Sequence, residues 1–273
     1  MWSISSSLVV DDVPTSPPSR SSTSPHKPPP QISPSFWKGA LRYCPLLWLL
    51  LVLPLSEVSA QSPRLRTDSR WELSVFFGLS ALGDGTYVTP VEGGTTRNVS
   101  LNFDSSYVLG VRIAESLGPR LGAELEYAVA NQPALFVNLG PSVPRLELNQ
   151  KVHKLAYNMV IYPREREDRI VPFVFIGLGA SFFDVSVDSK QEALQQGVEL
   201  EDRGKFAFSY GGGVKLAMAP DWGVRFDFRD HVTGVHDFGL PSTAPLQGVG
   251  FRPEGSSHNW QMSVGYLYTF GVR

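Results

Sequence analysis

The sequence predicts an all-β fold, an eight-stranded antiparallel up-and-down transmembrane β-barrel, and three observations support this. Large apolar side chains recur at every second position in eight segments, which places them on one face of a strand. The connections between the segments alternate between short and long, as in barrels with short periplasmic turns and longer external loops. The last segment, 260–270, is rich in aromatic residues and ends close to the C-terminus.

Each segment is near the length, roughly 9–11 residues, that a tilted strand needs to cross a bilayer. The predicted strands are 71–81, 106–116, 120–130, 152–162, 171–183, 205–217, 222–230 and 260–270. The last strand shows the alternation most clearly, because small or polar residues separate its large apolar ones. Those apolar residues are Trp260, Met262, Val264, Tyr266, Tyr268 and Phe270.

The connections fall into two classes. The short ones are 117–119, 163–170 and 220–221, and the long ones are 82–105, 131–151, 184–204 and 231–259. The long connections are rich in Gly, Pro, Asp and Ser, so we expect them to be exposed loops. An even number of strands would place both ends of the barrel on the periplasmic side.

The N-terminal segment is predicted to be targeting sequence. Residues 1–37 are rich in Ser and Pro and have no hydrophobic period, which indicates a disordered extension or, alternatively, a mis-assigned start. Lys38 and Arg42 precede an apolar run and a small-residue site ending at Ala60, as in a secretory signal peptide. An organelle transit peptide is a further alternative, which the scarcity of Arg disfavours. The predicted organisation is 1–37 extension, 38–60 signal peptide, 61–70 short periplasmic lead and 71–273 outer-membrane barrel.

Composition excludes several classes of function. The 273 residues carry a net charge of −2, which does not favour a nucleic-acid partner. The only cysteine, Cys44, lies in the predicted signal peptide, so we expect neither a disulfide nor a thiolate metal site in the mature chain. The histidines lack the spacing of a metal site, and we expect no cofactor.

Charged side chains of both signs fall on the strand face opposite the apolar stripe. The lumen of an eight-stranded barrel is just wide enough for side chains to fill it. Opposite charges should pair there, because unpaired charge away from water is costly. We therefore expect an internal ion-pair network that plugs the lumen. Its predicted members are Glu72, Arg112, Glu124, Glu126, Lys215, Arg225, Asp227 and Arg229.

Aromatic residues on the apolar faces gather near the strand ends. Two such bands are typical of the two membrane interfaces, and they disfavour a soluble barrel with an apolar interior. The predicted interface aromatics are Trp71, Trp222, Tyr268 and Phe270 on the periplasmic side, and Tyr107, Tyr127 and Trp260 on the external side.

The pattern Ser263-x-Gly265-x-x-Tyr268-x-Phe270 resembles the C-terminal sorting signal of bacterial outer-membrane proteins. Together with the eight-strand pattern, it makes 71–270 similar to the small outer-membrane β-barrel superfamily, of the type seen in the membrane domain of OmpA-like proteins. The resemblance implies an integral protein of the outer membrane of a Gram-negative-type bacterium, surrounded by lipid and lipopolysaccharide. It also implies recognition by the barrel assembly machinery through Gly265, Tyr268 and Phe270.

Fold alone does not assign an activity. We expect a non-enzymatic barrel with a structural role in the envelope or a binding role for its loops, and a narrow passive channel is one alternative. The other is an outer-leaflet lipid hydrolase similar to the lipid A deacylases, which use a His-x-Ser arrangement with an acidic partner. His231, Thr233 and Asp237 are the candidate base, nucleophile and orienting acid, with Thr where that family has Ser.

Overall fold

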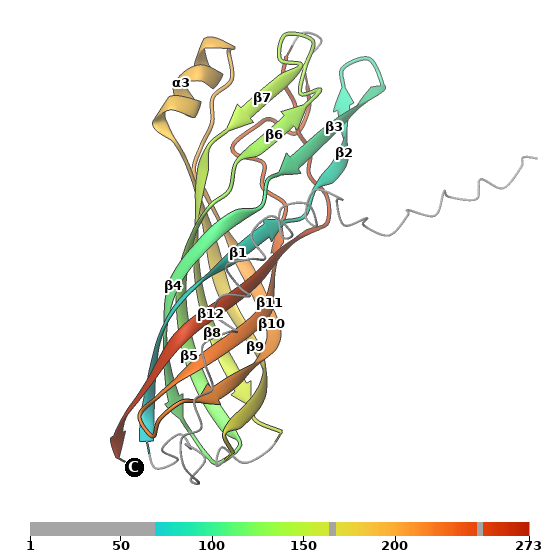
Figure 1. The fold of residues 1–273 in the computed structure, drawn as a ribbon. Coiled ribbons are helices and arrows are strands. Elements are labelled where there is room, and N and C mark those ends of the chain that lie inside the picture. Colours follow the sequence, from blue (N-terminus) through green and yellow to red (C-terminus); the bar gives the residue numbers. More distant parts are fainter. Residues whose placement is uncertain (1–68, 164–167, 245–247, 273) are drawn as a thin grey trace, which may run out of the picture. The chain divides into compact units, whose positions relative to one another are not determined.

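The protein is described by a computed structural model that covers residues 69–163, 168–244 and 248–272. The predicted extension and signal peptide lie outside the described residues. Eight antiparallel strands form a closed barrel in the order β1-β12-β11-β10-β9-β8-β5-β4, which confirms the predicted fold class (Figure 1). The barrel strands are β1 (Ser69–Leu82), β4 (Ser106–Ser116), β5 (Leu121–Asn131), β8 (Gln150–Ile161), β9 (Ile170–Val185), β10 (Arg203–Ala217), β11 (Trp222–Gly234) and β12 (Ser256–Val272).

The alternation of the sequence becomes an alternation between the inside and the outside of the barrel. On β12, Met262 and Tyr266 are each 53% exposed, whereas Gln261 and Leu267, each directly next to one of them, are 0% exposed. Apolar side chains point outward because the surrounding lipid favours them, and the backbone polar groups are satisfied by strand pairing. Among the described residues, no helix is long and apolar enough to cross a membrane.

Several strands are longer than the sequence predicts, on the side of the long connections. β11 ends at Gly234 rather than at residue 230, and β12 begins at Ser256 rather than at residue 260. The two strands stay paired there through Thr233 opposite Ser257 and Gly234 opposite Ser256. The prediction ended each strand where its apolar stripe ended, but backbone pairing continues through the polar residues beyond that stripe.

Glycines in β10 allow an unusually close approach of its neighbours. A Cβ atom added to Gly213 would lie 2.0 Å from the carbonyl oxygen of Phe226, and one added to Gly211 would lie 2.7 Å from the ring of Phe175. Both positions therefore require glycine. The space that these glycines leave inside the barrel is filled by the inward-pointing rings of Phe173 and Phe175.

The long connections are not simple loops, which differs from the prediction. They contain a second, four-stranded sheet in the order β2-β3-β6-β7, which Figure 1 shows beyond the barrel end of β1. The 184–204 connection contains the helix α3 (Val187–Gln195), whose N-cap Ser186 accepts a hydrogen bond from the amide of Ser189. The sheet strands are β2 (Gly85–Val91), β3 (Thr95–Phe103), β6 (Ala134–Val137) and β7 (Arg145–Leu148).

We call this sheet, α3 and the described residues of the long connections, including the one between β11 and β12, the head. The head has its own apolar core, in which the ring of Phe136 packs edge-on against Phe238 and Phe251 at centroid distances of 5.6 and 5.1 Å. Leu82, Val152 and Phe183 join that core from the ends of barrel strands. The head therefore packs directly on the barrel rim. Val99, Leu101 and Phe103 alternate along β3 and are buried. This alternation is the sequence pattern from which a strand of the head could have been predicted.

Candidate functional site

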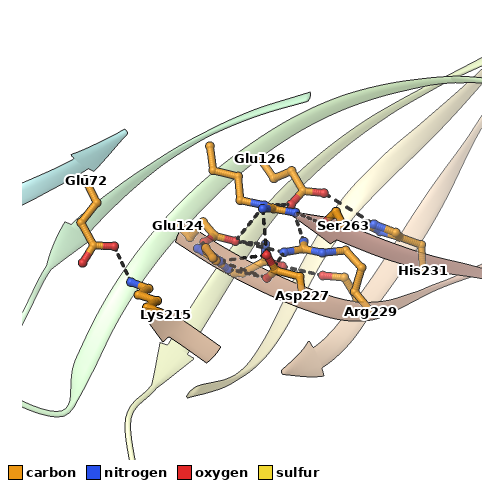
Figure 2. A network of polar contacts seen from close by, with 12 residues as sticks. Glu72, Glu124, Glu126, Lys215, Asp227, Arg229, His231 and Ser263 are labelled. Atoms are coloured by element: carbon orange, nitrogen blue, oxygen red, sulfur yellow. Dashed lines mark hydrogen bonds and ion pairs between the residues drawn. The ribbon is translucent and has the colours of Figure 1, made fainter. Parts of the chain in front are cut away.

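The centre of the barrel lumen holds six charged side chains in mutual contact. They come from β4 (Arg112), β5 (Glu124 and Glu126) and β11 (Arg225, Asp227 and Arg229), and their side chains are at most 1% exposed. Each falls on the inward-facing register of its strand. Three guanidinium groups thus face three carboxylates, so the cluster is formally neutral. Figure 2 shows Glu124, Glu126, Asp227 and Arg229 of this cluster converging between the strands.

The ion pairs link β11 to β4 and β5 across the lumen, and others join residues of the same or neighbouring strands. Arg112 donates to Glu126 on the neighbouring strand and, through Nη1, to Asp227 Oδ2 across the barrel at 3.0 Å. Arg225 donates to Glu124 and, through Nη2, to Asp227 Oδ1 at 2.8 Å. Arg229 Nη1 lies 2.6 Å from Glu126 Oε2. Every carboxylate therefore meets at least two guanidinium groups, which offsets the cost of burying the charges.

Aromatic rings cover the guanidinium groups inside the barrel. The guanidinium carbon of Arg112 lies 3.6 Å from the ring centroid of Phe76, and those of Arg225 and Arg229 lie 4.3 Å from Phe173 and Phe175. Such cation–π contacts stabilise a desolvated cation and exclude water from its flat face. The sequence analysis did not assign these phenylalanines a role, although their position between outward-facing residues of β1 and β9 places them inside.

A further ion pair lies nearer the barrel end that carries the short connections. Lys215 on β10 donates to Glu72 on β1 and to the hydroxyl of Tyr162 at 2.8 Å. Its ammonium group is 4.9 Å from the Tyr162 ring centroid. The structure therefore brings the eight predicted lumen residues together as two groups, the six-membered cluster and the Glu72–Lys215 pair. The two groups are separate because Glu72 and Lys215 lie near the short connections, whereas the cluster lies at the centre of the lumen.

Towards the head, a layer of neutral amides and hydroxyls surrounds one buried lysine. Lys154 Nζ donates to Ser80 Oγ at 3.0 Å, Asn259 Oδ1 at 3.1 Å and Gln261 Oε1 at 3.2 Å. Gln132 and Asn259 extend this layer through a hydrogen bond of 3.2 Å. Lys154 was missed by the sequence analysis, although Leu155 beside it points outward and parity places Lys154 inside. The lumen thus contains three levels: the Glu72–Lys215 pair, the six-membered cluster and the layer around Lys154. We call their charged and polar side chains the lumen network.

The comparison with known families settles the class of this protein. Residues 49–270 match the family described as "Outer membrane protein beta-barrel domain", which is most of the chain. The chain belongs to this outer-membrane β-barrel family. It is therefore an integral protein of the outer membrane, and the resemblance found in the sequence is confirmed. No match was found among curated proteins.

The solved structure of one outer-membrane protein agrees on the fold. The outer membrane protein OprG from Pseudomonas aeruginosa superposes with a TM-score of 0.57 at 13% identity, covering 77% of this chain and 100% of OprG. Neisserial surface protein A superposes with a TM-score of 0.45 at 9% identity, covering 73% of this chain and 97% of that protein. At these identities the likeness to OprG concerns the barrel fold alone.

In this outer-membrane barrel, the predicted interface aromatics occupy opposite ends of the outer wall. At one end, Trp71 pairs with Phe270 across β1 and β12, and Trp222 pairs with Tyr268 across β11 and β12. Towards the head, Tyr107 is 48% and Tyr127 is 45% exposed, and Trp260 stacks on Phe228 with centroids 5.3 Å apart. Their depth in a bilayer stays a prediction.

The three residues considered for hydrolysis lie apart from the outer wall. His231 and Thr233 alternate on β11 with outward-facing residues and are only 1% and 4% exposed, because both point into the lumen. His231 Nε2 lies 3.8 Å from Glu126 Oε1, so its nearest acidic group is a member of the lumen network. Asp237 lies in the head, half-buried, near the backbone of Gly239. A lipid on the outer wall would not reach this His and Thr.

Proposed function

We propose that this outer-membrane barrel is closed to ions and presents its folded head to external partners. The observation that supports closure is the six-membered charged cluster, in which every carboxylate meets at least two guanidinium groups and ion pairs join β11 to β4 and β5 across the lumen. An eight-stranded barrel has room inside for side chains and little else. A hydrated ion would have to separate these pairs in order to pass.

The other two levels add to this argument. The Glu72–Lys215 pair lies below the cluster, the Lys154 layer lies above it, and the apolar core of the head covers the barrel rim. A solute entering from either end meets buried, mutually bonded groups. The lumen network therefore acts as a structural brace that holds the strands together, and we assign it no reaction.

The head supports a binding role. Its exposed surface is carried by a sheet with a packed core rather than by independent loops, so its shape exists before a partner binds. Ordered recognition surfaces lose less conformational entropy on association than flexible loops do. The chemistry of the partner is open. On the periplasmic side, Gly265, Tyr268 and Phe270 at the end of β12 are the residues we propose for recognition by the assembly machinery.

Conductance across a planar lipid bilayer tests closure. The refolded wild-type protein should give a flat current, with no single-channel steps. The double variant Glu124→Ala/Arg225→Ala removes one positive and one negative group, so the remaining cluster stays neutral, and it should produce measurable steps. Steps in the wild-type record would contradict closure and favour the narrow passive channel.

The hydrolase alternative at His231 has a separate test. Lipid A extracted from cells with and without the protein should have the same acyl composition. A change that His231→Gln abolishes would favour hydrolysis, although the inward orientation of His231 argues against it.

A further inference from the structure

A carboxylate interrupts the apolar outer face of β11. Trp222, Phe226 and Phe228 are exposed on this face, at 37%, 38% and 46%. Asp230 follows in the same register, and it is only 1% exposed because side chains of both neighbouring strands cover it. A charged group on the lipid-facing wall is unfavourable, so its surroundings call for an explanation.

Two side chains converge on one oxygen of this carboxylate. The hydroxyl of Tyr210 on β10 donates to Asp230 Oδ2 at 2.9 Å. His258 Nδ1 on β12 lies 2.6 Å from the same oxygen. The imidazole also stacks on the indole of Trp260, with centroids 5.8 Å apart and planes inclined by 13°. A carboxylate at one nitrogen and a stacked ring below hold the histidine in a single orientation.

The second nitrogen of this imidazole is directed to the surroundings of the barrel. The His258 side chain is 38% exposed, and Nε2 forms no hydrogen bond with any residue in the described part of the chain. When both ring nitrogens carry protons, both are donors. Nδ1–H then serves Asp230, and Nε2–H is available to an acceptor outside the protein.

The height of the site identifies the acceptor. Asp230 lies eight residues beyond Trp222 on β11, which is roughly 26 Å along the strand and about 20 Å along the membrane normal at the usual strand tilt. The apolar band of such barrels is about 25 Å tall. With Trp222 at the periplasmic interface, as the sequence predicts, Asp230 and His258 lie near the outer edge of that band, where lipid phosphates lie, and Phe228 and Tyr210 beside them can contact acyl chains.

We propose that His258, oriented by Asp230 and Trp260, binds the phosphate group of an outer-leaflet lipid through Nε2–H. Tyr210 shares the charge of Asp230 and so limits the repulsion between that carboxylate and the phosphate. The proposal rests on the place of the barrel in the outer membrane and not on closure of the lumen. Conductance and lipid binding therefore succeed or fail independently.

Native mass spectrometry of the protein released from a maltoside detergent tests this site with two matched lipids. Dioctanoyl phosphatidic acid carries the phosphate, and dioctanoylglycerol has the same chains without it. The wild type should retain phosphatidic acid in preference to dioctanoylglycerol. Loss of one charge-assisted hydrogen bond should weaken that retention about tenfold in His258→Gln and several-fold in Asp230→Asn.

His153→Gln is the matched control. His153 also faces outward near the head and bonds a tyrosine, with Nδ1 2.8 Å from the Tyr127 hydroxyl, but it has no carboxylate partner among the described residues. This variant should bind as the wild type does. Heat-modifiable gel mobility verifies that each variant is folded. Equal retention of the two lipids, or unchanged binding by a folded His258→Gln, would overturn the proposal. Inorganic phosphate bound as well as phosphatidic acid would overturn the assignment to a lipid.

Discussion

The barrel and the head bury opposite kinds of side chain. The barrel encloses Arg112, Arg225 and Arg229 with their carboxylates and exposes apolar residues, whereas the head encloses residues such as Leu101 and Phe136 and exposes polar ones along β3. Both are built from alternating strands. The difference teaches that alternation specifies two faces, and the solvent outside decides which face is buried. Lipid around the barrel reverses the arrangement that water imposes on the head.

The two interiors should respond differently to deletion, and the largest effect is expected in the barrel. Glu124→Ala leaves Arg225 and Arg229 with fewer partners in a buried site, so we expect a loss of about 3–5 kcal/mol in the free energy of unfolding. Denaturant titration of the protein in lipid vesicles, followed by gel mobility, measures it. The control is Glu147→Ala, which removes an ion pair with Arg145 whose side chains are 66% and 64% exposed and should cost less than about 1 kcal/mol. Equal losses would refute the difference between the buried and exposed pairs.

A cavity in the core of the head should destabilise the head and leave the stability of the barrel unchanged. Leu101→Ala opens a cavity in the apolar core of the head and should cost roughly 2–5 kcal/mol there. Limited proteolysis of the head in intact vesicles reports its local opening, while gel mobility reports the barrel. Faster cleavage with unchanged mobility is expected. If heat-modifiable mobility were also lost, the two regions would form one cooperative unit.

Acid should open the head through His236. Burial among apolar side chains, with repulsion from Lys205, lowers the pKa of His236 to about 3. Below pH 6.5 the unfolded segment binds a proton that the folded head does not bind, so head stability falls as the pH falls. The slope is roughly 1.4 kcal/mol per pH unit down to pH near 3. Hydrogen exchange of the head between pH 7 and 4.5 measures this, and His236→Leu should flatten the dependence. An unchanged slope in that variant would assign the effect to another group.

The smallest of these effects concerns the helix of the head. Ser186→Ala removes the side chain that accepts from the Ser189 amide at the start of α3, at a cost of about 1 kcal/mol. Ser186→Asp keeps an acceptor there and should restore the loss. Proteolysis rates in the 184–204 connection distinguish the two variants, and equal rates would show that the cap contributes nothing measurable.

The sequence was informative where the period of two is long and uninterrupted. The eight barrel strands and the inward position of residues such as Arg112 and Asp227 followed from parity alone. The head was missed because two of its strands, β6 and β7, have only four residues each, and because all four lie in segments rich in Gly and Pro that read as loops. The site at His258 was also missed, since its three side chains come from three strands and meet only through the register of β10, β11 and β12.

By itself, the sequence determined the number of barrel strands, the face that each of their side chains occupies and the presence of balanced charge inside the barrel. Those properties are local, because a side chain two positions along a strand must point the same way. The tertiary structure alone decided which arginine meets which carboxylate, how the long connections fold into a head, and that Asp230 meets His258 and Tyr210. These contacts depend on how far each strand is shifted against its neighbour and on what lies across the barrel, and no single strand contains that information.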